Sequence, residues 1–198
     1  SRDDVNANNF DNFIQLDPNK SLDVLDDLPE NIDGLVYCPG TINLRSLQRL
    51  TLEDIKNEME VNFYGAFNII KKVLPNLKKN DGASVVLFST VAVKTGMPMH
   101  SSIAAAIGAL EGLAKSLAAE LAPRVAINCV APSIVDTKLA ANILSTDERK
   151  QASADRHPLK TIGSINSIAN SAYFLLQAKE NWISGQIFRP DGGLSALK

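Results

Sequence analysis

The stretch from residue 83 to residue 137 constrains the fold more than any other part of the chain. Two short apolar runs, at residues 84–88 and 125–130, flank an Ala- and Leu-rich helical stretch at 101–121, which Pro123 ends. Short apolar runs rich in β-branched residues are typical of strands that are buried on both faces of a parallel sheet. The stretch therefore predicts a strand, a helix and a second parallel strand.

The same alternation extends to both sides of this stretch. Apolar runs predict strands at residues 10–16, 34–38 and 183–188, and apolar residues spaced by three and four predict helices at 51–74 and 164–175. Parallel strands need crossover connections, which are expected to be right-handed. We therefore predict an α/β fold with a doubly wound parallel sheet between two layers of helices.

Several side chains have the positions of helix caps. Ser21 precedes a short amphipathic segment, Ser164 begins the predicted helix at 164–175, and Thr51 with Asp54 has the spacing of a capping box. We expect each of these residues to mark the first turn of a helix.

Residues 138–162 differ in character from the segments around them. They contain few β-branched runs, and Ser145 with Glu148 again matches a capping box, so we expect exposed helices and a loop. Such a segment close to strand ends often covers a ligand. We interpret residues 138–162 as a substrate lid.

Composition narrows the function classes. A chain of 198 residues with 45% hydrophobic content predicts one domain, 1–198, with a substantial core. The net charge is −2 and the 20 basic residues are dispersed, so we expect no nucleic-acid partner. No apolar run approaches the roughly 20 residues of a membrane span and no secretory signal is recognisable, so we expect a cytoplasmic protein without a membrane partner.

The two cysteines favour the same compartment. Cys38 and Cys129 both lie in apolar runs that predict central strands, and they lack the CxxC spacing of redox or metal sites. We expect both thiols to be buried and to serve packing, and we expect no metal site.

The predicted sheet brings distant polar groups together. Ligands of open parallel sheets bind outside the carboxyl ends of the strands, near the topological switch point. This rule gathers Asp17, Thr90 and the segments 39–40 and 132–137 along one edge. We expect them to line one crevice.

Four motifs occur in order along the chain: CPGT at 38–41, VNFYGAF at 61–67, VAPSIVDT at 130–137 and ISGQIFRPDGG at 183–193. From about residue 10 to residue 193 the sequence resembles the short-chain dehydrogenase/reductase family. The resemblance implies a Rossmann-like fold and an oxidoreductase that uses NAD(P)(H) on a small carbonyl or alcohol substrate. It also implies homodimers or homotetramers formed through the predicted helices at 51–74 and 101–121.

The resemblance assigns catalytic positions that this chain fills unusually. Asn62 matches the active-site Asn and Thr90 matches the Ser, but Ile103 and Ile107 stand at the positions of the proton-transferring Tyr and of its Lys partner. General acid–base help is worth on the order of 10²–10⁴ in rate. Two interpretations remain open: an oxidoreductase with weak or altered activity, and a non-catalytic binding or assembly protein.

Other residues leave alternatives open. If the alignment with the family is shifted by one residue, Ser89, Ser102 and Ala106 take the positions of the family's Ser, Tyr and Lys. This alignment does not restore a proton donor at the Tyr position. Thr90 is either an active-site hydroxyl or a strand-end hydroxyl bonded to backbone. His100 is either a replacement acid or a residue of the helix start, and His157 either contacts substrate or belongs to the lid loop.

The cofactor positions implied by the resemblance are incomplete. Cys38, Pro39 and Gly40 resemble the family's turn beside the cofactor, and Pro132, Val135 and Thr137 match positions near the nicotinamide, with Ser133 where the family has Gly. Asp17 matches the acidic residue near the adenine, or else it belongs to a turn before Pro18.

The family's Gly-rich GxxxGxG turn does not occur in the sequence. We therefore expect the family's first strand–helix–strand unit to be missing from this chain. By the same layout, Arg2 would meet a 2′-phosphate and favour NADP(H).

Overall fold

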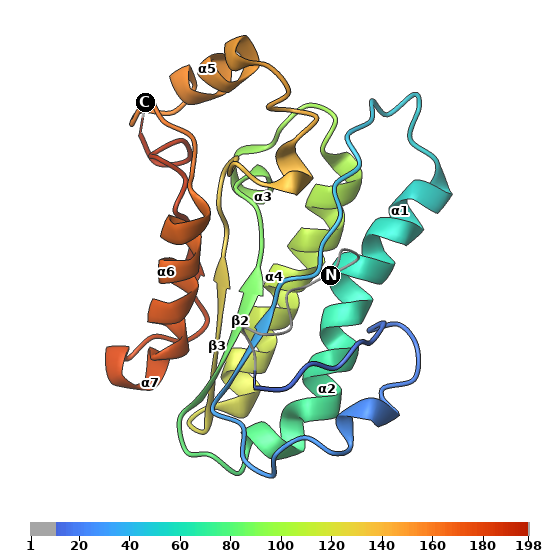
Figure 1. Ribbon diagram of the computed structural model, residues 1–198, viewed down its shortest axis with the longest axis vertical. Helices are drawn as coiled ribbons and strands as arrows, with labels where there is room; N and C mark the ends of the chain where they lie inside the picture. Colours follow the sequence, from blue (N-terminus) through green and yellow to red (C-terminus); the bar gives the residue numbers. More distant parts are fainter. Residues whose placement is uncertain (1–10, 198) are drawn as a thin grey trace.

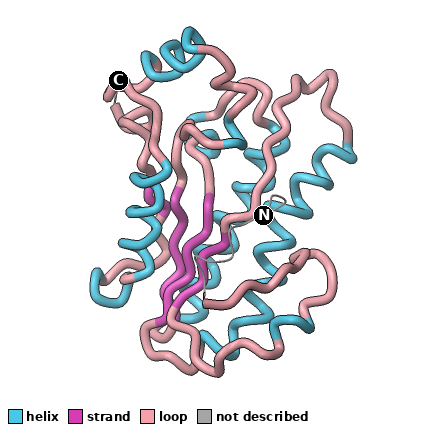
Figure 2. Tube along the Cα trace, in the orientation of Figure 1, coloured by secondary structure: helices cyan, strands magenta, loops and turns pink. Residues whose placement is uncertain are grey.

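The computed structural model describes residues 11–197 (Figure 1). Within them a parallel sheet has the strand order β1-β2-β3-β4 (Figure 2). The strands are β1 (Gly34–Tyr37), β2 (Ala83–Phe88), β3 (Val125–Val130) and β4 (Ile187–Phe188). The helices are α1 (Leu52–Met59), α2 (Gly65–Leu77), α3 (Ala92–Thr95), α4 (Ser101–Leu121), α5 (Asp147–Asp155), α6 (Ile165–Leu176) and α7 (Ala178–Asn181).

Strand β2 lies in the middle layer and is buried on both faces. Val85 and Leu87 belong to the core cluster that includes residues of α2 and α4, whereas Val86 packs in a second cluster with Ile168 and Leu175 of α6. Because side chains alternate along a strand, helices cover both faces of the sheet. Figure 1 shows α6 on one side and α2 and α4 on the other. The predicted three-layer α/β fold is confirmed.

The three crossovers do not share one hand. All strands are parallel and follow one another in space, yet α2 and α4 cover one face while α6, between β3 and β4, covers the opposite face. A crossover on the opposite face has the opposite hand. The prediction that every crossover is right-handed is therefore wrong.

The helix predicted at 51–74 is present, but it is interrupted. A π-helical turn, η3 (Glu60–Tyr64), joins α1 to α2 and contains Asn62. Pro75 lies inside α2 instead of ending it. Thr51 forms the predicted capping box, since its Oγ1 accepts from the Asp54 amide at 3.1 Å and the Asp54 carboxylate accepts from the Thr51 amide at 2.9 Å.

The helix predicted at 101–121 and the strand predicted at 125–130 have the expected bounds. By length and composition α4 is the one helix among residues 11–197 that would suffice to cross a membrane. It packs against β3 and α1, with Ala106, Leu110 and Ala114 almost fully buried. Its apolar character is explained by this position in the core.

The amino-terminal predictions are wrong in part. Residues 11–16 form no strand, and Phe13 and Ile14 are 53% and 40% exposed; Phe10 lies outside the described residues. A strand requires a hydrogen-bonded neighbour, and within the described chain this segment pairs with none. The segment after Ser21 forms only a 3₁₀ turn, η2 (Asp23–Leu25).

The last strand is shorter than predicted. Only Ile187 and Phe188 form β4 beside β3. The backbone before them still bonds to β3, since the Gly185 amide donates to the Ile127 carbonyl at 2.8 Å, while the Asn128 side chain donates to the Ile183 carbonyl at 3.2 Å and accepts from the Gln186 amide at 2.9 Å. Ser164 caps α6 as predicted, through a 3.1 Å bond from the Ser167 amide.

The region at 138–162 contains a 3₁₀ turn, η4 (Lys138–Ala140), and α5. The capping residue of α5 is Thr146, whose Oγ1 accepts from the Arg149 amide at 3.3 Å. The predicted cap, Ser145, is wrong by one residue, and its hydroxyl instead accepts from the Arg149 side chain at 2.8 Å.

The two thiols lie in different environments. Cys129 is fully buried in β3, as predicted, and burial raises its pKa to about 12. Cys38 is exposed, because β1 already ends at Tyr37, so the prediction that it is buried in a strand is wrong. Both cysteines are free.

The capping box at Thr51 gives a stability test. Thr51→Ala removes one partner of the reciprocal bonds and is expected to lower the free energy of unfolding by about 1 kcal/mol, whereas Thr51→Ser keeps the hydroxyl and is expected to stay near wild type. Hydrogen bonds from the Thr51 backbone and hydroxyl lower the pKa of Asp54 below 3.8. The gap between wild type and Thr51→Ala is therefore fully present above pH 3.8 and shrinks as the pH falls below it.

Urea unfolding at several pH values measures both effects. An equal loss of stability in the Ala and Ser variants would contradict the assignment of the cap.

Candidate functional site

The carboxyl ends of three neighbouring strands meet at one edge of the sheet. The segments that follow them are 38–40 after β1, 89–90 after β2 and 131–137 after β3. Backbone bonds tie the last two segments together: the Ser89 amide donates to the Val130 carbonyl at 2.7 Å and the Val91 amide donates to the Pro132 carbonyl at 3.0 Å. The fold therefore brings these predicted site segments to the same edge.

Asn62 is buried at the π-helical turn and fastens the segment after β1. Its Oδ1 accepts from the Thr41 amide at 3.2 Å, and its Nδ2 donates to Thr41 Oγ1 at 3.1 Å and to the Glu58 carboxylate at 2.8 Å. A Cβ on Gly40 would lie 3.2 Å from Asn62 Oδ1, which is tighter than ordinary contacts. The close approach favours glycine at position 40.

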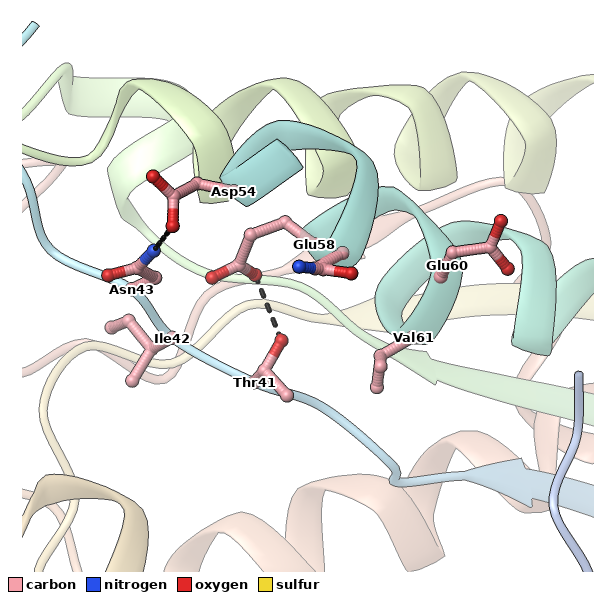
Figure 3. Close-up of a pocket in the computed structure, with 8 residues that line it drawn as sticks. Thr41, Ile42, Asn43, Asp54, Glu58, Glu60 and Val61 are labelled. Atoms are coloured by element: carbon pink, nitrogen blue, oxygen red, sulfur yellow. Dashed lines mark hydrogen bonds between the residues drawn. The ribbon is translucent and has the colours of Figure 1, made fainter. Parts of the chain in front are cut away.

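Glu58 is the site residue that sequence analysis missed. It is 2% exposed, and its Oε2 also accepts from Thr41 Oγ1 at 3.0 Å (Figure 3). Burial raises the pKa of Glu58, although hydrogen bonds from Thr41 and Asn62 act in the opposite direction. The sequence signal was its spacing: Glu58 precedes Asn62 by four residues, which places both on one helix face.

A cavity of about 350 Å³ lies beside this cluster. The residues that line it come from the segment after β1 and from α1 with η3: Thr41, Ile42, Asn43, Asp54, Asn57, Glu58, Glu60 and Val61. Figure 3 shows Glu58 between Asn43 and Thr41, and Asn43 Nδ2 donates to Asp54 at 2.9 Å.

Thr90 lies at the end of β2 and bonds to backbone. Its Oγ1 accepts from the amide of Ala92, the first residue of α3, at 3.3 Å. Among the described residues no hydrogen bond joins Thr90 to Asn62. These contacts match the interpretation of Thr90 as a strand-end hydroxyl.

Ile103 and Ile107 are part of the main hydrophobic core. They are 4% and 6% exposed, in the same cluster as Tyr37. Neither side chain carries a proton that could be transferred. The positions that the family resemblance gives to Tyr and Lys thus serve packing in this chain.

The residues of the shifted alignment also have protein partners. The Ser89 hydroxyl donates to Glu111 Oε1 at 2.5 Å, and both residues are buried. The Ser102 hydroxyl faces the Asn43 carbonyl at 3.4 Å, and Ala106 is fully buried. This alignment restores no acid.

The two histidines are held by backbone carbonyls. His100 Nδ1 lies 2.7 Å from the Pro98 carbonyl at the start of α4, which matches its interpretation as a residue of the helix start. His157 is 4% exposed; its Nδ1 lies 2.7 Å from the Ser153 carbonyl and its Nε2 lies 2.8 Å from Ser133 Oγ. Because a carbonyl only accepts, Nδ1 carries the hydrogen, and in the neutral ring the Ser133 hydroxyl donates to Nε2.

Both ring nitrogens of His157 are bonded to protein atoms, so neither is free to bond a substrate. They instead tie the segment at 138–162 to the segment after β3.

The predicted cofactor residues differ in exposure. Cys38, Pro39 and Gly40 are exposed, whereas Pro132 and Thr137 are half-buried. Val135 forms a backbone bridge to Gly163, at the end of the predicted lid. Asp17 is exposed and its carboxylate accepts from the Asn19 amide at 3.0 Å, as in a turn. The strand-end positions therefore remain available to a ligand, and Asp17 forms the turn before Pro18.

Comparisons with known proteins identify the family. A family model described as Enoyl-(Acyl carrier protein) reductase matches residues 20–195. A 3-oxoacyl-acyl-carrier-protein reductase from Aquifex aeolicus is 32% identical over 177 residues, which cover 89% of this chain and 71% of that protein. The chain belongs to the short-chain dehydrogenase/reductase family.

Other relatives of the family agree. A tropinone reductase homolog from Arabidopsis thaliana is 32% identical over 162 residues, 81% of this chain and 62% of that protein, so the chain spans less than two thirds of this relative. A short chain dehydrogenase family protein from Francisella tularensis is 28% identical with a TM-score of 0.83, covering 93% of this chain and 81% of that one. ElxO with NADP bound is 25% identical with a TM-score of 0.83, covering 92% and 77%.

The His157 contacts give a second stability test. His157→Ala leaves the Ser133 hydroxyl and the Ser153 carbonyl without partners, and it is expected to lower the free energy of unfolding by about 1–3 kcal/mol. The control is His100→Ala, which removes a half-buried ring and is expected to change stability by less than about 0.5 kcal/mol. Thermal unfolding measures both. A smaller loss for His157→Ala than for the control would contradict the role assigned to His157.

Proposed function

We propose that the protein is an NAD(P)-dependent oxidoreductase of the short-chain dehydrogenase/reductase type, which acts weakly on a small carbonyl or alcohol substrate. The observation that carries this proposal is the strand-end edge, where Asn62 holds the exposed segment after β1 in place. Family membership supports the same activity. A nicotinamide cofactor would supply the hydride.

The residues present fit one end of such a cofactor. Pro39 and Gly40 are exposed, and Thr137 offers a half-buried hydroxyl at the same edge, where backbone and side-chain groups would hold a nicotinamide carboxamide. Ser133 is already bonded to His157, so the segment after β3 is fixed before a cofactor arrives. Residues 138–162 would cover the bound ligand as a lid.

The chain's own groups determine how fast such a reaction runs. Asn62 fixes the loop through Thr41, but Ile103 and Ile107 neither donate a proton nor lower another group's pKa. Without the usual acid, turnover is expected to fall by about 10²–10⁴ relative to a family enzyme that has it.

A second candidate function is a non-catalytic binding or assembly protein. The burial of Ile103 and Ile107 in the main core favours it, because these positions contribute to packing instead of facing a ligand. Nucleotide binding without turnover would distinguish this candidate from the first.

The remaining parts of the proposal concern cofactor choice, assembly and location. We favour NADP(H), which one similar protein, ElxO, binds. We expect a homodimer or homotetramer, supported by the exposed Leu52, Tyr64 and Phe67 on α1, η3 and α2. The free thiols of Cys38 and Cys129 favour a reducing, cytoplasmic location.

Restoring the missing groups tests the proposed function. In the full-length protein, Ile103→Tyr with Ile107→Lys is expected to raise NADPH-dependent reduction of a panel of small carbonyls by on the order of 10² or more, because an acid and its charged partner return. The matched control is Ile103→Phe with Ile107→Lys, which adds the ring without the phenol and is expected to stay at the wild-type rate.

Thermal unfolding of each variant shows whether the substitutions at these buried positions leave the protein folded. Folded variants that bind no nucleotide in calorimetry would contradict the oxidoreductase proposal.

A further inference from the structure

Glu58 occupies an unusual place for a carboxyl group. It is 2% exposed, on the face of α1 that turns toward Asn62 and Thr41, and acidic side chains are rarely buried unless a cation is paired with them. Its Oε2 receives hydrogen bonds from Thr41 Oγ1 at 3.0 Å and from Asn62 Nδ2 at 2.8 Å. Both partners are neutral, so no cation compensates a charge on Glu58.

The charges around Glu58 oppose its ionisation. Asp54, one turn earlier on α1, adds a like charge, and Glu60 lines the same cavity from η3. The nearby cation, Arg45 on the loop, is engaged with Asp54 at 3.4 Å, and α4 presents the neutral Ser102 to this loop. The raised pKa of Glu58, caused first by burial, agrees with these surroundings.

The hydrogen bonds to the Glu58 carboxyl group fall on one of its two oxygens. Asn62 Nδ2 carries two hydrogens and Thr41 Oγ1 carries one, and together they reach the Glu58 carbonyl and Glu58 Oε2. Glu58 Oε1 has no partner among the described residues, although the Asn43 amide nearby favours the charged form. A charged carboxylate with one buried oxygen unpaired is costly, and this cost is lower for the neutral acid.

We propose that Glu58 is a neutral carboxylic acid that positions Asn62 and Thr41 and exchanges its proton with solvent through the adjoining cavity. The cavity of about 350 Å³ has room for several waters, and Glu58 is part of its wall. Glu58 acts through Asn62 and is therefore a positioning residue. Its effect on turnover rests on the proposed function, whereas its protonation state does not.

The stability profile of Glu58→Gln tests the protonation state without any turnover. Gln has the shape of the neutral acid and does not titrate. A carboxyl group whose pKa is raised by folding destabilises the protein once the pH exceeds its unfolded value of 4.5, and the loss grows until the pH passes the folded value. Glu58→Gln is therefore expected to gain stability relative to wild type as the pH rises from about 4.5 to 8.

The matched control is Glu60→Gln, which lies on the same helical segment and lines the same cavity but is exposed. Its stability relative to wild type is expected to stay flat over this pH range. A Glu58→Gln variant that loses stability relative to wild type as the pH rises would overturn the proposal, because it would show that the carboxylate is the bound form.

Carbon-13 NMR of glutamate-labelled full-length protein gives a second readout. One carboxyl resonance is expected to titrate above 4.5 and to be missing in Glu58→Gln. A Glu58 resonance that titrates at or below 4.5 would overturn the proposal even if the variant were unstable.

Turnover gives a separate test of the positioning role. If Glu58 positions Asn62 for reaction, the pH profile of kcat is expected to lose one ionisation in Glu58→Gln and to keep it in Glu60→Gln. An unchanged profile overturns the positioning role. Absence of turnover in every variant, together with the expected NMR titration, overturns the proposed function and leaves the neutral Glu58 established.

Discussion

The pairing of β2 with β3 is the contact on which the rest of the structure depends. Six residues of each strand pair in register, and both strands are buried on two faces by helices. Because α2, α4 and α6 pack against this pair, a register shift would expose the core of both layers at once. The same register fixes the loops beyond the strands, where the amides of Ser89 and Val91 bond across to the segment after β3.

The segment after β1 begins at the same edge of the sheet, where Asn62 binds it through Thr41. The α1–α2 helix packs on the sheet, and its π-helical turn places the Asn62 amide, instead of an apolar side chain, against the segment after β1. The helix thereby buries Glu58 and Asn62 together, and the carboxyl group has only neutral donors. The cost of burying a charge makes the neutral acid the favoured form.

The long and strongly periodic elements were predictable, because their sequence pattern is set by burial alone: α4 and β3 have the predicted bounds. The structure of residues 11–16 was not predictable in this way. An apolar run becomes a strand only beside a partner strand, and no strand of the described chain pairs with this segment. Within the site, the position of Asn62 followed from family spacing. The burial of Glu58 could not be predicted in this way. Glu58 is more deeply buried than its apolar neighbour Met59, although methionine is usually buried more often than glutamate.

The two isoleucines connect the fold to the chemistry. Ile103 and Ile107 add apolar volume to the core, and the family resemblance gives these two positions to a phenol and an ammonium group. Replacing a buried polar pair by apolar side chains is often neutral or favourable for stability, since no charge has to be desolvated. Such a replacement would also remove the titratable group that proton transfer needs. Among the groups bonded to Asn62, Glu58 is the one that titrates, so any proton chemistry that passes through Asn62 depends on that carboxyl group.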